Sequence, residues 1–206
     1  MPAPQATIPA TPAVECALAC ARQYTEELEH LKQVARLAAM LFDVLEPIHK
    51  LGPAELDLLC CAALLHDIGI SVSCARHHKH SARLIRQSSL PALTADEREK
   101  VACIARYHRK AVPKPKHQDF AALGEADRQR VRSLSAILRL ADGLDRAHEN
   151  AVERLDAHRD SPVQWTVWVA GPGDLAYAAW GAERKAELFR DVFGLTVRFD
   201  PVGFAG

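Results

Sequence analysis

Apolar residues recur at helical spacing from residue 14 to residue 148. Pro47 ends the first of these segments, and Gly52 with Pro53 opens the next, because proline is tolerated in the first turn of a helix. Thr94 and Glu97 form a capping-box pattern at the start of a later segment. The predicted helices span residues 14–45, 53–67, 78–87, 94–108 and 125–148.

The pattern changes after residue 150. Residues 164–169 are rich in strand-forming types, and we expect residues 152–157 to pair with them as a hairpin. A helix over 180–193, closed by Gly194, and a final strand over 195–199 follow. We therefore predict a mainly α protein with a disordered tail over 1–12, a helical body over 13–149 and a small α+β unit over 150–206.

The composition is that of an ordinary soluble globular protein. Of 206 residues, 49% are hydrophobic and 25% are charged, and no apolar run approaches the roughly 20 residues of a membrane span. Lys and Arg number 26 and balance 26 Asp and Glu, so the net charge indicates neither a nucleic acid nor a membrane as partner. No signal-peptide pattern and no CxxC pair are present, so we expect a cytoplasmic protein without a thiolate zinc site.

Positive charge is concentrated in one stretch. Residues 76–116 hold eleven Lys and Arg against three acidic residues. Such a stretch either binds an anionic ligand or forms a solvated basic face, and the charge pattern alone leaves both open.

His66 and Asp67 end a predicted helix that is apolar on every side. Burying two adjacent ionisable side chains costs several kcal/mol unless they are satisfied, and an ion just beyond the helix end would satisfy both. His30 begins an apolar helical stripe, and Asp142 lies inside an apolar segment. A mixed set of imidazoles and carboxylates suits Mn²⁺, Fe²⁺, Zn²⁺ or Mg²⁺ and leaves positions open for water and substrate.

Four blocks, residues 64–69, 77–85, 105–110 and 138–146, carry a resemblance to a known family. The chain resembles the HD superfamily of metal-dependent phosphohydrolases, and more narrowly the C-terminal helical domain of the exopolyphosphatase/guanosine pentaphosphate phosphohydrolase family. The resemblance implies an HD-domain helical bundle with His30, His66, Asp67 and Asp142 as metal ligands. Full-length members also have an N-terminal actin-like domain that hydrolyses polyphosphate. Nothing in this sequence corresponds to it, so that activity is not carried over.

Further histidines follow the His66–Asp67 pair. His77 and His108 lie about where HD enzymes with two metal ions carry additional ligands, so they are expected to hold a second ion through Asp67. The alternative is that His77, His78 and His80 form a partly exposed polar cluster that binds phosphate or nothing. The cofactor is thus one or two divalent ions. Three other histidines near predicted element ends are expected at the surface: His49, His148 and His158.

Six basic residues near the four blocks are expected to bind phosphate oxygens, because guanidinium and ammonium groups neutralise the charge that develops in phosphoryl transfer. The alternative for any single one is a surface cation. The six are Lys79, Arg106, Arg109, Lys110, Arg139 and Arg146.

These residues predict an HD-type phosphohydrolase that uses a metal-activated water on a phosphomonoester, nucleotide or phosphoanhydride, with Asp67 or Asp145 accepting the proton. The alternative is a non-catalytic accessory module that binds polyphosphate, a guanosine tetraphosphate-like nucleotide or a protein partner. In either case we expect a small phosphorylated or polyanionic ligand, no nucleic acid and no membrane. A homodimer is left open.

Overall fold

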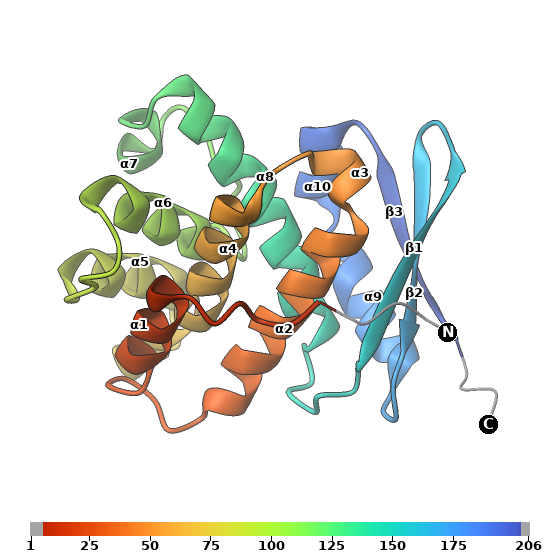
Figure 1. Cartoon of the computed structure of the whole chain (residues 1–206), viewed down its shortest axis with the longest axis horizontal. Coiled ribbons are helices and arrows are strands. Elements are labelled where there is room, and N and C mark those ends of the chain that lie inside the picture. Colours follow the sequence, from red (N-terminus) through yellow and green to blue (C-terminus); the bar gives the residue numbers. More distant parts are fainter. Residues whose placement is uncertain (1–5, 203–206) are drawn as a thin grey trace.

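A computed structural model describes residues 6–202, in which helices form one side of the molecule and a small sheet forms the other (Figure 1). The helical side consists of α1 (Pro12–Ala21), α2 (Leu28–Val44), α3 (Glu46–His49), α4 (Pro53–Leu65), the 3-10 turn η1 (Ile68–Ser71), α5 (His77–Gln87), α6 (Ala95–Arg106), α7 (Gln118–Ala121) and α8 (Glu125–Leu144). The remainder consists of β1 (Arg154–Ser161), β2 (Gln164–Ala170), α9 (Leu175–Glu183), α10 (Glu187–Phe193) and β3 (Thr196–Pro201). The prediction of a mainly α fold is confirmed.

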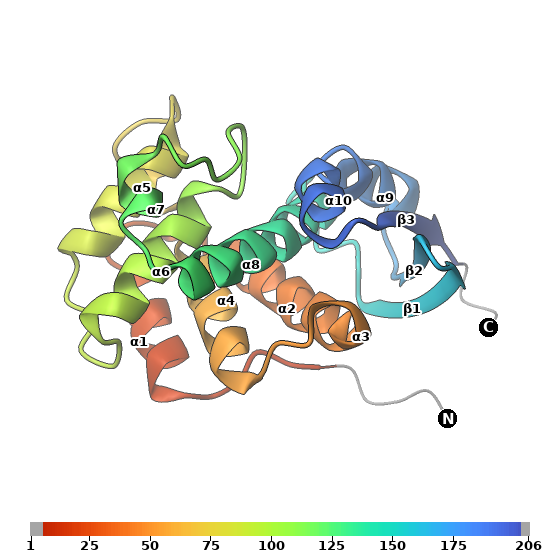
Figure 2. The ribbon, with the colours of Figure 1, turned by 90° about the horizontal axis from the view of Figure 1, so that it is seen from above.

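Helix α4 is the centre of the helical side. Every residue from Leu58 to Leu65 is buried, as its all-round apolar sequence predicts. Helices α1, α2, α6 and α8 all contact it. Helix α8 continues beyond this body and reaches α9 (Figure 2), so the two sides of the molecule are joined by packed helices as well as by the chain.

The sheet has the strand order β1-β2-β3. Strands β1 and β2 form the predicted antiparallel hairpin, and β3 returns parallel to β2 after α9 and α10. One face buries Val167, Val169, Val197 and Phe199, which alternate with exposed positions as a half-buried strand requires. Because α9 and α10 contact both α8 and β3, they lie between the helical body and the sheet (Figures 1 and 2).

Two glycines let α8 and α9 approach backbone to backbone. A Cβ on Gly143 would lie 2.6 Å from the carbonyl oxygen of Gly181, and a Cβ on Gly181 would lie 2.3 Å from that of Gly143. No side chain fits in either position. The contact holds α9 against the end of α8 that carries Asp142.

Three predicted helices differ from the observed ones. The segment 14–45 is two helices, because the polar run at 22–27 offers no apolar face to continue the first. The helix predicted over 180–193 is interrupted at residues 184–186, and α9 starts earlier, at Leu175. The helix predicted to reach residue 148 ends at Leu144, where Asp145 leaves the helical conformation and bonds the backbone N–H of Asn150.

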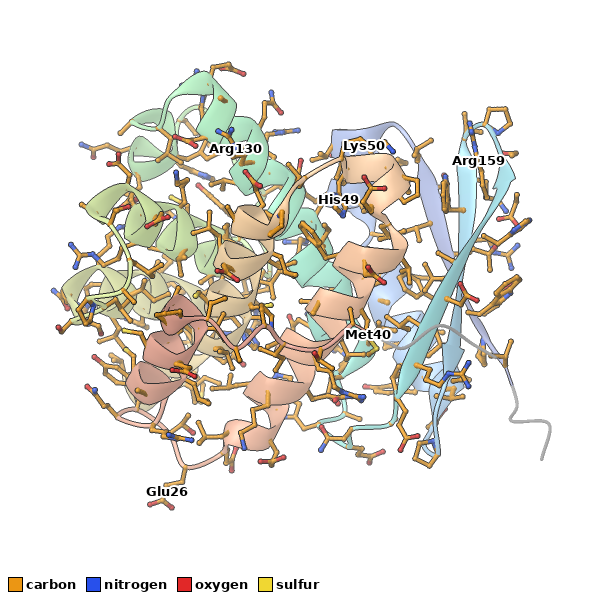
Figure 3. All side chains as sticks on the ribbon, in the orientation of Figure 1. Glu26, Met40, His49, Lys50, Arg130 and Arg159 are labelled. Carbon is orange, nitrogen blue, oxygen red and sulfur yellow. The ribbon has the colours of Figure 1, made fainter. Side chains whose placement is uncertain are left out.

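The expectation that His49 lies at the surface is wrong. His49 is the last residue of α3 (Figure 3) and is only 9% exposed. Its Nε2–H donates to the carbonyl oxygen of Phe42, and its Nδ1 accepts from the N–H of Leu51. A histidine that caps a tight corner in this way is buried with both ring nitrogens paired.

The predicted tail falls partly outside the described residues, since residues 1–5 are not among them. Ala6 and Ile8 pack against the core, and α1 already begins at Pro12 with Thr11 as its N-cap. Within residues 6–202, no helix combines the length and the apolar character that crossing a bilayer requires.

Candidate metal and phosphate site

Six imidazole and carboxylate side chains from five parts of the chain meet where α2, α4, α5, α6 and α8 come together. They form two neighbouring groups, and the ligand atoms within each group lie within 4.8 Å of one another. The first group is His30, His66 and Asp142, and the second is Asp67, His77 and His108. The sequence prediction brought His30, His66, Asp67 and Asp142 together as one set, and the structure places Asp67 with His77 and His108.

The two histidines of the first group are oriented by acceptors behind them. His30 Nδ1 lies 2.8 Å from Asp145 Oδ2, and His66 Nδ1 lies 2.7 Å from the carbonyl oxygen of Ala63. A carbonyl has no proton to give, so His66 carries a proton on Nδ1 and turns Nε2 inward. An acceptor behind the ring is the usual arrangement for a metal-binding histidine.

The second group is built in the same way. The Nδ1 of His108 lies 2.8 Å from the carbonyl oxygen of Ala105, and that of His77 lies 3.2 Å from the carbonyl oxygen of Cys74. Their Nε2 atoms lie 3.3 Å apart, and each also lies close to Asp67 Oδ1, at 3.1 Å for His77 and 3.4 Å for His108. Arg109 Nη1 also lies 3.1 Å from His77 Nε2, so positive charge already lies beside this group, and the ionised carboxylate would attract a further cation.

Three of these inward atoms have no hydrogen-bond partner within the described chain. They are His30 Nε2, His66 Nε2 and Asp67 Oδ1, and all three are buried. Leaving a buried polar atom unpaired costs about 1–3 kcal/mol, and more for a charged group. The donor set therefore fits a divalent ion of the borderline class that accepts both imidazole and carboxylate ligands.

The charge states of Asp67 and His108 also favour a bound cation. Burial raises the pKa of Asp67, but the neighbouring His66, His77 and His108 outweigh it and hold the pKa below its ordinary range. Burial lowers the pKa of His108 to about 3, and His66 acts in the same direction. At neutral pH Asp67 is therefore ionised and His108 is neutral, which are the forms that bind metal.

Asp142 has an additional partner that the sequence analysis missed. Lys185, in the break between α9 and α10, forms an ion pair with Asp142 Oδ2. Burial raises the pKa of Asp142, but Lys185, with His108 and His66, keeps it below its usual range. No local signal marks Lys185 in the sequence, because the packing of α9 on α8 brings it to the site.

The start of α5 is held against η1 by a close backbone contact. The N–H of Gly69 donates to Ser81 Oγ at 2.9 Å, and a Cβ on Gly69 would lie 2.3 Å from the carbonyl oxygen of His77. Arg76, directly before His77, adopts a left-handed conformation with φ of 59°. Such conformations are uncommon outside glycine and concentrate at functional sites. Together these features place His77 opposite Asp67.

A cavity of about 550 Å³ opens beside the two groups, and Asp67, His77, His108 and Asp142 line it. Arg139 is largely buried and donates from Nη1 to the carbonyl oxygen of Tyr107, while its Nε has no hydrogen-bond partner among residues 6–202. The cations that line the cavity are Arg109, Lys110, Arg139, Arg146 and Lys185. A cavity with this lining is suited to phosphate groups, which arginine binds through two parallel hydrogen bonds.

A second cavity, of about 450 Å³, lies on the His30 side and shares Asp67 and His148 with the first. Its rim includes the carboxylates of Glu26 and Glu27, and Glu26 is seen in the turn between α1 and α2 in Figure 3. His148 was expected at the surface and is exposed, but its ring stacks on His30 with centroids 3.6 Å apart. Its sequence context, past the end of a predicted helix, gave no sign of this contact.

Several predicted site residues have other surroundings. Arg106 donates to Asp119 at 2.8 Å, and neither Arg106 nor the exposed Lys79 lines the cationic cavity. Asp145 is 2% exposed and uses one oxygen for His30 and the other for the N–H of Asn150. One oxygen thus orients His30 and the other fixes the turn at Asn150, and the role of Asp145 as proton acceptor stays a prediction.

The chain was compared with known proteins. It is 28% identical over 87 residues to a curated protein of Pseudoalteromonas translucida (strain TAC 125), the guanosine-5'-triphosphate,3'-diphosphate pyrophosphatase. The match covers 40% of this chain and only 18% of that relative. Residues 15–167 match the family described as Ppx/GppA phosphatase, domain III, and these residues include all six members of the two groups. The chain therefore belongs to the Ppx/GppA phosphatase domain III family.

Proposed function

We propose that this protein is a metal-dependent phosphohydrolase of the HD type that acts on a small phosphorylated anion. The observation that carries the proposal is the set of three unpaired buried atoms, His30 Nε2, His66 Nε2 and Asp67 Oδ1, beside a cavity lined by five cations. The family match and the name of the relative support a phosphorylated substrate.

The ligand assignment follows the two groups. His30, His66 and Asp142 would hold one ion, and Asp67, His77 and His108 would hold a second. Asp67 faces both groups, since its Oδ2 lies 3.6 Å from His66 Nε2 and its Oδ1 lies near His77 and His108. A divalent ion such as Mn²⁺, Fe²⁺, Zn²⁺ or Mg²⁺ supplies Lewis-acid activation of water and of a phosphoryl oxygen when bound.

The surrounding residues of the chain orient the substrate and the ligands. Arg139, Arg109 and Lys110 face the cavity and would bind the phosphate oxygens and neutralise their charge. Asp145 fixes the ring of His30, and Lys185 holds one oxygen of Asp142 so that the other points toward His66, 4.0 Å away. Positioning by such partners is what keeps a site of this kind in its productive geometry.

The proposal is tested by measuring bound metal and catalytic turnover in two variants. Asp67→Asn should lose bound metal and hydrolysis of p-nitrophenyl phosphate and nucleotides while keeping its circular dichroism spectrum. Asp119→Asn, which alters an aspartate outside both groups, is the matched control and should keep both properties. Full turnover in Asp67→Asn, or wild-type protein that holds no metal after purification without chelator, would overturn the proposal.

A non-catalytic polyanion-binding module is the second candidate. The cationic cavity favours it, because five cations can bind a chain of phosphates whether or not a metal is present. The two candidates separate in a titration of metal-loaded protein with tripolyphosphate. Binding without release of orthophosphate indicates the module, and binding with release indicates the enzyme.

A further inference from the structure

A pair of aromatic rings stands at the surface beside the cationic cavity. Tyr177 and Trp180 lie three positions apart on α9 and therefore on one face of the helix. Their side chains are 40% and 45% exposed, and their rings stack with centroids 5.4 Å apart. Large apolar side chains that stay this exposed and lie together commonly mark a binding surface.

Two arginines hold this pair and connect it to the cavity. Arg146 donates from Nε to the Tyr177 hydroxyl at 3.3 Å, and its guanidinium lies 5.7 Å from the centre of the Trp180 ring. Arg184 lies 5.0 Å from the same ring. Tyr177 and Arg146 also line the cavity that holds Arg109, Lys110 and Arg139. The aromatic surface is therefore continuous with the proposed phosphate site.

We propose that Tyr177 and Trp180 form a stacking surface for the base of a nucleoside phosphate whose phosphate groups lie in the cationic cavity. The proposal rests on the proposed function for its phosphate site and names the substrate class that the site takes. A flat base gains from stacking on an aromatic ring, whereas a bare phosphate chain has nothing to place there. The arginines above Trp180 add attraction for the charged ligand.

Trp168 shows what an exposed aromatic residue looks like without these features. It is 38% exposed, but it lies on β2 between Asp156 and Asp200 of the neighbouring strands and stacks on His158. Two carboxylates beside it would repel phosphate, whereas Trp180 has two arginines beside its ring. Trp168 is therefore a matched control for Trp180.

Calorimetric titration with two ligands tests the proposal on the full chain. Guanosine triphosphate and inorganic tripolyphosphate carry the same number of phosphates, and only the first has a base. Both are titrated in the presence of chelator, so that no turnover disturbs the measurement. Wild-type protein should bind guanosine triphosphate about ten-fold more tightly than tripolyphosphate, as expected for one stacked base.

The variants should remove only this preference. Trp180→Ala should weaken guanosine triphosphate binding several-fold toward the level of tripolyphosphate and leave tripolyphosphate binding unchanged. Tyr177→Ala, which also alters the lining of the cavity, should weaken guanosine triphosphate binding more than tripolyphosphate binding. Tyr177→Phe keeps the ring and should keep most of the preference, as should the control Trp168→Ala. Preserved tripolyphosphate binding shows in each case that the variant is folded.

The possible results distinguish a failure of the stacking surface from a failure of the proposed function. Equal affinity of wild-type protein for the two ligands, or equal loss of both in Tyr177→Ala, would overturn the stacking surface and leave the phosphohydrolase proposal standing. A preference that survives in both alanine variants would likewise place the base elsewhere. If neither ligand binds and Asp67→Asn changes neither metal content nor turnover, the proposed function itself fails, and the stacking surface fails with it.

Discussion

His49 and His66 are both buried histidines, but the regions around them differ in how their polar atoms are paired. At the corner of α2 and α3, His49 has a backbone partner on each ring nitrogen. At the centre where five helices meet, His66 has a hydrogen-bond partner on Nδ1, but its buried Nε2 has none in the part of the chain that the structure describes. The hydrogen bonding of the ring nitrogens is thus complete at His49 and incomplete at His66.

The charged groups show the same difference. Between α5, α6 and α7, Arg86 pairs with Glu99 at 2.5 Å and with Asp119 at 3.3 Å, and Arg106 also pairs with Asp119. The centre instead gathers imidazole lone pairs and carboxylates around unpaired atoms. The first arrangement needs no ligand, because its charges are paired with one another in the folded chain. The second costs stability unless a ligand completes it, which is why it identifies the site.

The largest expected effect is stabilisation of the centre by metal. A ligand that binds only the folded chain adds about 4 kcal/mol to the free energy of unfolding when its free concentration is about 1,000 times its dissociation constant. Urea unfolding of chelator-treated protein with and without Mn²⁺ measures this. Asp67→Asn should show almost none of the gain, and an equal gain in the variant would place the ion elsewhere.

Replacing Lys185 should come next in size. Lys185→Met leaves the buried Asp142 carboxylate without its cation, and we expect a cost of about 2 kcal/mol, since breaking a fully buried pair costs about 3–5 kcal/mol and this pair is partly exposed. Because an ion at the site also compensates Asp142, added Mn²⁺ should recover much of the loss. Urea unfolding of the variant in chelator and in Mn²⁺ gives both values.

A recovery no larger than the gain of wild-type protein would mean that Lys185 supports the fold rather than the site. Arg190→Met, which removes an exposed cation of α10, provides a baseline for the loss of one positive charge.

The region around Asp119, whose charges are paired within the fold, and the centre around Asp67 should respond differently to metal when a carboxylate is lost. Asp119→Asn should destabilise the protein by about 1 kcal/mol in chelator and in Mn²⁺ alike, a value kept low because the pair is partly solvated. Asp67→Asn should cost more in Mn²⁺ than in chelator, since only the metal-loaded protein loses a ligand of the ion. Parallel thermal melts in the two conditions compare the variants, and an equal cost of Asp67→Asn in both would contradict the distinction.

The smallest expected effect is the pH response of His49. Burial lowers the pKa of His49 below its ordinary value of 6.5, so the unfolded chain binds its proton more readily than the folded chain. The contribution of His49 is therefore complete above pH 6.5 and decreases as pH falls from 6.5 through the lowered pKa. Urea unfolding at several pH values, compared with His49→Gln, should show a shallower decline in the variant. An unchanged slope would mean that other groups cause it.

The local sequence was enough to locate most of the helices and to single out His30, His66, Asp67 and Asp142, whereas His77 and His108 came from the resemblance to HD enzymes with two metal ions. Helical periodicity is a short-range property, so α4, α5, α6 and α8 could be placed from it. His66, Asp67 and Asp142 stood out because ionisable residues are rare within apolar helical segments. The polar run at 22–27 marks the first break in the helices, whereas residues 184–186, where α9 and α10 separate, carried no comparable signal.

Only the tertiary structure decided what surrounds those six residues. Lys185, His148 and the Tyr177–Trp180 pair reach the site because α9 docks on α8 through Gly143 and Gly181 and because the chain turns back after Leu144. Arg106 does not line the cationic cavity, and its guanidinium instead pairs with Asp119, thirteen residues away in the sequence. Contacts of this kind depend on how distant segments pack, and a one-dimensional pattern of apolar and polar residues does not contain that information.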